Sequence, residues 1–313
     1  MFHGRVEIVA AKPVELAPGV FHLQGGSNIG LVIEDGQGLL VDAGLDKDTA
    51  RQALRVAEAM DVELVAVFLT HAHADHFGGA AYLQRRLDVP HYAPATEAAM
   101  MENPVIEPLY LFSGAAPIEE LRGKFTLAPA CQIDHVIPFQ GTAPEPVEIG
   151  PFQVDVVPLP GHSLNQMGLA VGPVLFCADA VFPAETLEKH KVIFCVDMDT
   201  TIATLERLPE LPYDQFAPGH GPAYTAQEIG PICAANRERM DEVREQVRGA
   251  LETGPQETAA LVQHVADHFG LRLRTPTSYF LTRTPVLAAL SSLEAANQVT
   301  AKMKDNRLLW KIK

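Results

Sequence analysis

Short apolar runs broken by Gly, Pro and Asp fill the first two-thirds of the chain, a pattern typical of strands separated by turns. The segment NIGLVIEDGQGLLVDAG predicts two strands joined by a turn at Asp35 and Gly36, because these residues tolerate a positive φ. DKDTARQALRVAEAM predicts a helix with one apolar face, and the continuously apolar VELVAVFLT predicts a buried strand. Strands are also predicted in FQVDVVPLPGHS, QMGLAVGPVLFCADAVFP and YDQFAPGHG, and a helix in DTTIATLERLPEL.

Two regions depart from this pattern. Residues 97–145 contain several prolines and only fragments of helical periodicity, so we expect an insertion whose turns pack near the mouth of a site. From about residue 228 the periodicity is helical: three helices precede a hairpin that turns at Asp305-Asn306. We predict one domain over residues 1–227 and a small domain with the outline of a winged helix over residues 228–313.

Composition narrows the class of protein. Apolar residues make up 47% of the 313 residues and charged residues 20%, which suits a globular protein with a large core. No run of 18 apolar residues predicts a membrane span, and the first residues lack the apolar core of a secretory signal, so we expect a cytoplasmic protein. The four cysteines are widely spaced, so we expect them to be buried rather than paired.

The net charge of −15 is unevenly distributed. Residues 1–229 hold 12 Lys+Arg against 30 Asp+Glu, whereas residues 230–313 hold 12 against 9. An acidic body repels nucleic acid and anionic membranes, so a small-molecule substrate is favoured over a nucleic acid.

The stretch LTHAHADHFGGA crowds three histidines and an aspartate into six residues directly after the predicted buried strand. In an extended loop, side chains two apart point the same way, so His71 and His73 can face one point. Asp75 and His76 follow about a turn later and can face a second point nearby. Imidazole and carboxylate groups are ligands of zinc, iron and manganese, so this loop predicts a site for metal ions.

Three single residues follow later apolar runs: His162 in PLPGHS, Asp179 in FCADA and His220 in APGHGP. Each stands where a predicted strand ends. Strand ends of one layered structure can converge on a common edge, where functional residues tend to collect. We therefore expect these side chains to meet the histidine cluster.

In this order, THAHADH, PGHS, ADA and PGHG resemble the metallo-β-lactamase superfamily over about residues 15–225. The resemblance implies an α+β fold, a four-layer αββα sandwich, with two divalent metal ions, zinc first, with iron or manganese as alternatives. It implies that Asp42 holds a ligand loop or a histidine N–H in place, and that Asp75 also orients the nucleophile or takes up a proton. The implied ligands are His71, His73 and His162 for one metal, Asp75, His76 and His220 for the other, and Asp179 as the bridge.

Some features depart from particular relatives. Asp179 stands where the main subclass of β-lactamases has Cys, and His76 follows Asp75 where they lack a histidine, so antibiotic hydrolysis is not the expected activity. Ala178 precedes Asp179 where many relatives have Gly. Persulfide dioxygenases, which use a single iron, share the histidines and are not excluded. The C-terminal part resembles the winged-helix appendage of a subgroup that includes ribonucleases.

We expect a dinuclear metal hydrolase of the glyoxalase II type, acting on a small ester, thioester or lactone. Alternatives are a phosphodiesterase or ribonuclease of the winged-helix subgroup and an iron-dependent redox enzyme. We also expect a homodimer. The sequence does not identify substrate-binding residues; His190, Tyr110, Phe112 and Ser113 are candidates, and other histidines, such as His22, are interpreted as surface or structural.

Overall fold

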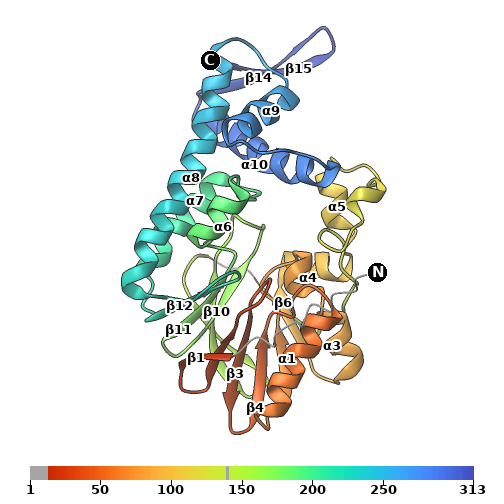
Figure 1. The fold of residues 1–313 in the computed structure, drawn as a ribbon, viewed down its shortest axis with the longest axis vertical. Coiled ribbons are helices and arrows are strands. Elements are labelled where there is room, and N and C mark those ends of the chain that lie inside the picture. Colours follow the sequence, from red (N-terminus) through yellow and green to blue (C-terminus); the bar gives the residue numbers. More distant parts are fainter. Residues whose placement is uncertain (1–12, 139–140) are drawn as a thin grey trace, which may run out of the picture.

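The computed structural model describes residues 13–138 and 141–313, so the first twelve residues of the predicted first domain and two residues of the predicted insertion lie outside it. Two β-sheets pack face to face, and helices cover both outer faces (Figure 1). A long helix leads from this sandwich to two further helices and a two-stranded hairpin at the C-terminal end (Figure 1). The predicted four-layer fold with an appendage is confirmed.

The first sheet has seven strands in sequence order. Its first four strands pair antiparallel, and β4 to β7 pair parallel. The strands are β1 (Pro13–Ala17), β2 (Val20–Leu23), β3 (Ile29–Glu34), β4 (Gln37–Val41), β5 (Glu63–Phe68), β6 (His91–Pro94) and β7 (His135–Ile137).

The second sheet has six strands in the order β13-β12-β11-β10-β9-β8. Only the β11–β12 pair is parallel. The strands are β8 (Glu145–Ile149), β9 (Phe152–Pro158), β10 (Met167–Val171), β11 (Val174–Ala178), β12 (Gln215–Pro218) and β13 (Tyr224–Thr225).

Three apolar cores hold these layers together. Leu39, Phe68 and Phe176 belong to the core between the two sheets. On the outer face of the first sheet, α1 (Lys47–Ala59) and α3 (Ala80–Arg86) bury the small side chains that give them their apolar faces. On the outer face of the second sheet, residues of α7 (Met198–Arg207) and α8 (Ala226–Glu252) pack on β11 and β12. Burial of each large side chain stabilises the fold by about 1.5–3 kcal/mol.

The predicted insertion at residues 97–145 is more regular than its sequence indicates. It carries most of α4 (Ala95–Glu102), α5 (Ile106–Leu111) and the 3₁₀ turn η1 (Glu119–Leu121). Its later residues supply β7 to the edge of the first sheet and the start of β8 to the edge of the second. These elements are too short to leave a clear periodicity, which is also why α6 (Ala184–His190) and β1–β2 were not predicted.

The C-terminal part contains α8, α9 (Thr258–His268), α10 (Pro276–Ala295) and the hairpin of β14 (Val299–Lys304) and β15 (Arg307–Ile312). The third helix begins at Pro276, where a capping box at Thr275 and Ser278 starts it. The hairpin turns at Asp305-Asn306 as predicted. Its assignment as a winged helix remains a prediction.

The helix α8 belongs to both parts of the molecule. Ile229 and Cys233, near its start, lie in the core beneath the second sheet. Val243 and Val247, further along, lie in a core shared with α9 and α10. None of the helices in the described part of the chain is both long and apolar enough to cross a membrane. All four cysteines are buried and unpaired, as predicted.

The insertion also contacts the C-terminal part. The rings of Phe112 and Phe280 pack edge to face with centroids 5.4 Å apart. Arg283 donates a hydrogen bond to Ser113 Oγ at 3.0 Å. Thr277 Oγ1 donates to the carbonyl of Glu120 at 2.7 Å. Phe112 and Ser113, candidates for a pocket lining, therefore contact α10.

We expect a change to alanine to lower the free energy of unfolding at Gly78 and to raise it at Gly249. A Cβ at Gly78 would lie 2.0 Å from the carbonyl oxygen of Leu45, whereas one at Gly249 in α8 would meet nothing within 4 Å. Gly78→Ala should lower the free energy of unfolding by about 3 kcal/mol, since backbone must move to relieve the overlap. Gly249→Ala should raise it by up to about 1 kcal/mol. Denaturant unfolding of both variants checks this, and an unchanged Gly78→Ala protein would contradict the close packing below the histidine loop.

Candidate metal centre

Seven polar side chains from distant parts of the sequence meet at the ends of the two sheets. Four of them follow β5: two lie in the loop that leaves this strand and two in the short helix α2 (Ala74–Phe77). The other three follow β9, β11 and β12. Their nitrogen and oxygen atoms form three groups, each within 4.8 Å: His71, His73 and His162; His71, His76 and Asp179; and Asp75, His76 and His220.

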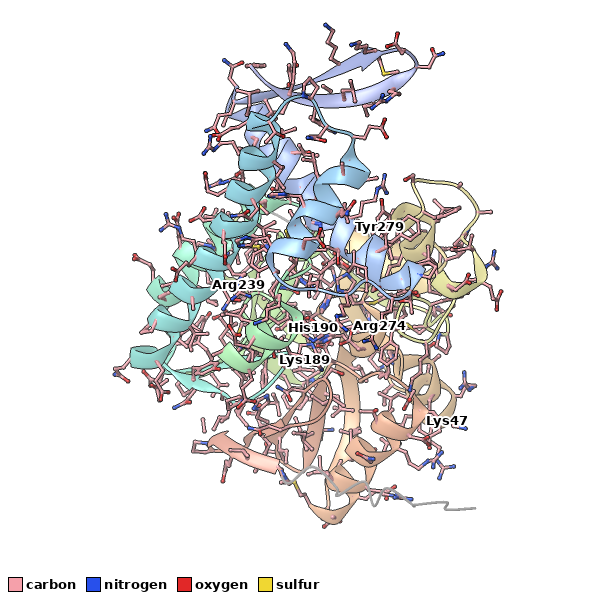
Figure 2. The ribbon with its side chains drawn as sticks, turned by 45° about the horizontal axis from the view of Figure 1, so that its top comes forward. Lys47, Lys189, His190, Arg239, Arg274 and Tyr279 are labelled. Atoms are coloured by element: carbon pink, nitrogen blue, oxygen red, sulfur yellow. The ribbon has the colours of Figure 1, made fainter. Side chains whose placement is uncertain are left out.

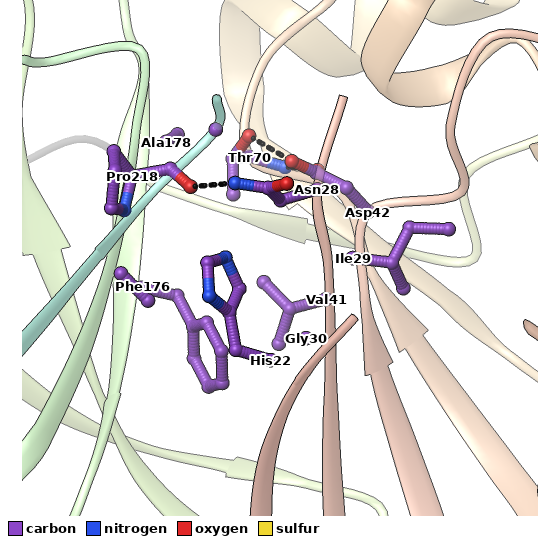
Figure 3. A pocket seen from close by; sticks show the side chains of 12 residues that line it. His22, Asn28, Ile29, Gly30, Val41, Asp42, Thr70, Phe176, Ala178 and Pro218 are labelled. Atoms are coloured by element: carbon purple, nitrogen blue, oxygen red, sulfur yellow. Dashed lines mark hydrogen bonds between the residues drawn. The ribbon is translucent and has the colours of Figure 1, made fainter. Parts of the chain in front are cut away.

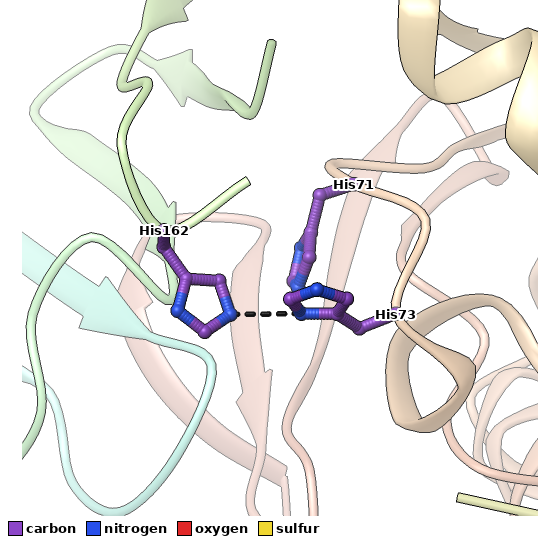
Figure 4. A group of neighbouring side chains, drawn as sticks. All are labelled: His71, His73 and His162. Carbon is purple, nitrogen blue, oxygen red and sulfur yellow. Dashed lines mark hydrogen bonds between the residues drawn. The ribbon is translucent and has the colours of Figure 1, made fainter. Parts of the chain in front are cut away.

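The first group consists of three buried histidines (Figure 4). His73 Nδ1 and His162 Nε2 lie 2.8 Å apart, and the ring of His71 lies 4.7 Å from that of His73, centroid to centroid. Two ring nitrogens at 2.8 Å repel each other unless a proton or a cation lies with their lone pairs. This group therefore has the donor set of a metal site.

Asp179 lies between two triads of these side chains. The first triad is His71, His73 and His162, and the second is Asp75, His76 and His220. Its Oδ2 is 3.5 Å from His162 Nε2 and 3.4 Å from His220 Nε2, and its Oδ1 is 3.3 Å from His76 Nε2. The preceding Ala178 has a φ of +47° next to a register shift in the β11–β12 pair. This is the left-handed region that favours glycine, so the alanine here is strained.

Hydrogen bonds on the outer side of the rings set their tautomers. The Nδ1–H groups of His162 and His220 donate to the carbonyls of Phe194 at 2.9 Å and Gly26 at 2.8 Å. With Nδ1 protonated, each neutral ring presents the lone pair of Nε2 to the centre. The tautomer that ligates a metal is thus already selected by the fold.

Asp42 sets the tautomers of two more rings from the end of β4. Its Oδ2 accepts hydrogen bonds from His76 Nδ1 at 2.8 Å and from Thr70 Oγ1 at 2.9 Å. Because the Thr70 proton is used there, the Nδ1–H of His71 donates to Thr70 Oγ1 at 3.0 Å. Asp42 is only 3% exposed and has a φ of +67°. It therefore orients both His71 and His76.

A small cavity of about 10 Å³ lies beneath these residues, between the sheets (Figure 3). Asp42, Thr70 and Phe176 line it, together with the buried His22. Burial lowers the pKa of His22 to about 4, so this histidine is neutral at physiological pH. His22 is therefore buried rather than at the surface, and it belongs to none of the three groups of the centre.

Burial and charge divide the histidines into two classes. Burial lowers the pKa of His71, His73 and His162 and keeps these rings neutral, the form that binds metal. Burial is the largest influence on His76 and His220 and acts to lower their pKa, but the charges of Asp179 and Asp75 and the hydrogen bonds of both rings to carboxylates together outweigh it and raise both pKa values. The carboxylates thus attract positive charge to the second group.

Two buried carboxyl groups near the centre were not predicted. Glu97 of α4 is fully buried and accepts hydrogen bonds from Ala72 N, Ser163 Oγ and Asn165 N. Burial raises the pKa of Glu107 of α5, and the charges of Asp75 and Glu97 raise it further, so the insertion lies close to the centre. Neither stands in a recognisable motif; the only signal is an acid within an otherwise apolar helix face.

His190 lies at the end of α6, near enough to the centre for the charge of His220 to act on its pKa. Burial lowers its pKa, as do the charges of Lys189 and His220. Arg239 of α8 donates hydrogen bonds to the carbonyls of Leu187 at 2.9 Å and Lys191 at 2.8 Å, beside His190 (Figure 2). The long C-terminal helix therefore holds the segment that carries His190.

The side chains fit cations. His71 Nε2, His76 Nε2 and Asp179 Oδ1 are buried and lack a hydrogen-bond partner. Across residues 13–138 and 141–313, the ion-pair partners of Asp42, Asp75 and Asp179 are histidines, never lysine or arginine. Unpaired buried carboxylates and lone pairs are costly, and divalent cations would satisfy both.

Comparison with known proteins identifies the family. The sequence model of the metallo-beta-lactamase superfamily matches residues 23–220. A hydroxyacylglutathione hydrolase of Xylella fastidiosa is 25% identical over 263 residues, 81% of this chain and 83% of the relative. The "Probable metallo-hydrolase YqgX" of Bacillus subtilis is 25% identical over 215 residues, 66% of this chain and 92% of the relative.

Solved structures share the fold. A β-lactamase domain protein from Burkholderia ambifaria superposes with a TM-score of 0.73 at 21% identity, covering 97% of this chain and 94% of its own. A metallo-β-lactamase family protein from Thermus thermophilus gives a TM-score of 0.70 at 17% identity, covering 96% of this chain and 100% of its own. At these identities the likeness concerns the fold alone.

The fold and the family match define a metal-dependent hydrolase. The chain belongs to the metallo-β-lactamase superfamily.

Removing divalent metal should destabilise the protein. Binding at 100 times Kd stabilises the folded state by about 2.7 kcal/mol, which corresponds to roughly 4 °C in Tm for a chain of this size. We expect dialysis against a chelator to lower Tm by about this amount. Adding zinc should restore Tm in the wild type but not fully in Asp179→Ala. Equal Tm values with and without metal would contradict a metal centre built from these buried groups.

Proposed function

We propose that the protein is a dinuclear hydrolase that cleaves the acyl bond of a small thioester, ester or lactone. His71, His73 and His162 would hold one cation, and Asp75, His76 and His220 the other, with Asp179 shared between them. The observation that carries this proposal is the position of Asp179, whose two oxygens lie within 3.5 Å of ring nitrogens from both triads. Zinc suits this set of nitrogen and oxygen donors, although iron or manganese can also use it.

When bound, a pair of divalent cations supplies a nucleophilic hydroxide at neutral pH and polarises the carbonyl of the substrate. The protein positions the groups around that reaction. The Asp75 side chain is 33% exposed, against 6% for Asp179, and its Oδ2 lies 3.4 Å from His220 Nε2. Asp75 is therefore the carboxylate that can meet substrate, orient the nucleophile and take up a proton.

A thioester is the acyl substrate that the comparisons favour. Relatives from Xylella fastidiosa and from Xanthomonas euvesicatoria, which align over 81% and 87% of this chain, are named hydroxyacylglutathione hydrolases. The acyl group of such a compound is joined to sulfur, so its hydrolysis is an attack on a thioester carbonyl. The net charge of −15 also favours a small molecule over a nucleic acid.

One observation favours a second candidate, a phosphodiesterase or ribonuclease. The hairpin β14–β15 exposes Lys302, Lys304 and Arg307 on an otherwise acidic protein. Such a basic hairpin can contact a phosphate backbone, and the same pair of cations can promote attack on phosphorus. Salt-dependent RNA binding would support this candidate.

The test is hydrolysis by the zinc-loaded protein of thioesters, lactones, phosphodiesters and short RNA. We expect thioester or lactone turnover that falls at least about a thousandfold in Asp179→Ala, because that variant removes the shared ligand. Lys302→Ala, on the hairpin, is the matched control and should retain acyl hydrolysis. Turnover of RNA alone, lost in both variants, would favour the second candidate. A coloured iron protein that consumes oxygen without hydrolysing any of these compounds would contradict both.

A further inference from the structure

We infer that Glu97 is a positioning residue that joins the two loops carrying His71, His73 and His162 and thereby sets the affinity of that one metal site. The inference rests on the two-site arrangement of the proposed function. Glu97 lies in α4, outside the segments that supply the seven side chains.

The contacts of Glu97 connect two loops that are distant in sequence. Its Oε2 accepts a hydrogen bond from the backbone N–H of Ala72, which stands between His71 and His73, at 2.9 Å. Its Oε1 accepts hydrogen bonds from Ser163 Oγ and from the N–H of Asn165, both at 2.8 Å. These two residues closely follow His162. One carboxylate thus holds both sides of the first histidine group.

Burial raises the pKa of Glu97, whereas its three hydrogen bonds act to lower the pKa and favour the ionised form. The residue is 0% exposed, and the three bonds come from two backbone N–H groups and a serine hydroxyl. Hydrogen bonds to an ionised acceptor in a low-dielectric interior are about twice as strong as neutral ones. A carboxylate can accept all three, because it has two acceptor oxygens. A glutamine would turn an NH₂ donor towards either Ala72 N–H or the Ser163–Asn165 pair, and one side would lose its acceptor.

The second triad is held by other residues. Asp42 orients His76, and the carbonyl of Gly26 orients His220. Asn28 fixes the loop of His220 through hydrogen bonds from Nδ2 to the carbonyls of Pro218 at 2.9 Å and Gly221 at 2.8 Å. A change at Glu97 should therefore act on one site and leave the other unchanged.

The test is titration of the metal-free full chain with zinc against a chromophoric chelator, with cobalt absorption as a second reading of each site. We expect Glu97→Gln to weaken one of two sites by about 10–100-fold, the range for partners that orient metal ligands, and to leave the other within a few-fold. The matched control is Glu102→Gln. Glu102 lies on the same helix and also accepts a backbone hydrogen bond, from Ile133 at 3.2 Å. It is exposed, and Ile133 belongs to neither of the two loops that Glu97 joins.

Ser163→Ala provides a milder variant if Glu97→Gln does not fold. It removes one of the three donors and should weaken the same site by a smaller factor. In the double variant the two effects should be less than additive, since both act through one carboxylate. Zinc affinities equal to wild type at both sites in either single variant, or equal losses at both sites, would overturn the inference. The Tm of the metal-free variants separates a loss of affinity from a loss of folding.

The outcome is separable from that of the proposed function. A wild-type protein that binds one equivalent of zinc contradicts the two-site assignment, whatever its activity. The role of Glu97 then stands or falls on whether that single site weakens in Glu97→Gln and not in Glu102→Gln. Conversely, two zinc sites of which one depends on Glu97 support the inference even in a protein that hydrolyses none of the tested thioesters.

Discussion

The arrangement of the centre depends on one electrostatic constraint. Histidine lone pairs and carboxylates are buried together, and among the described residues the carboxylates pair with histidines and with no lysine or arginine. His73 Nδ1 and His162 Nε2 face each other at 2.8 Å, and the carboxylate oxygens of Asp179 lie within 3.5 Å of ring nitrogens of three histidines. Such a cluster is costly without cations, because both desolvation and mutual repulsion oppose it. The hydrogen bonds on the far sides of the rings from Asp42 and from backbone carbonyls keep it assembled. These outer hydrogen bonds therefore stabilise the folded protein and offset the unfavourable free energy of the buried cluster.

The sandwich makes this possible by bringing strand ends together. Asp42, His162, Asp179 and His220 each follow a strand, so the position of each side chain is set by a sheet rather than by a free loop. The backbone is tight where two strands end, because Asp42 and Ala178 have positive φ values. Strain at these positions persists because the surrounding core between the sheets over-determines them.

Two helices of the C-terminal part, α8 and α10, contact segments that lie near the centre. The helix α8 passes from the core beneath the second sheet to the C-terminal core, and its Arg239 holds the end of α6 next to His190. The helix α10 contacts the insertion through Phe280 and Arg283. The C-terminal part thus contacts both the segment that carries His190 and the insertion that carries Glu107.

The sequence by itself determined the central strands of the sandwich and the seven polar residues, because a buried strand is a continuous apolar run and a histidine after such a run is conspicuous. The short strands β1, β2, β7 and β8 left no such signal. The sequence also determined the long helix and the final hairpin, whose periodicity and turn residues are strong local signals. Only the tertiary structure decided which atoms meet and what holds them. Glu97 and Glu107 were missed because a single acid in a short helix carries no local pattern, and their importance comes from loops far away in sequence. The contacts of Phe112 and Ser113 with α10 were missed for the same reason. Where an irregular segment packs is decided by a partner distant in sequence and not by its neighbouring residues.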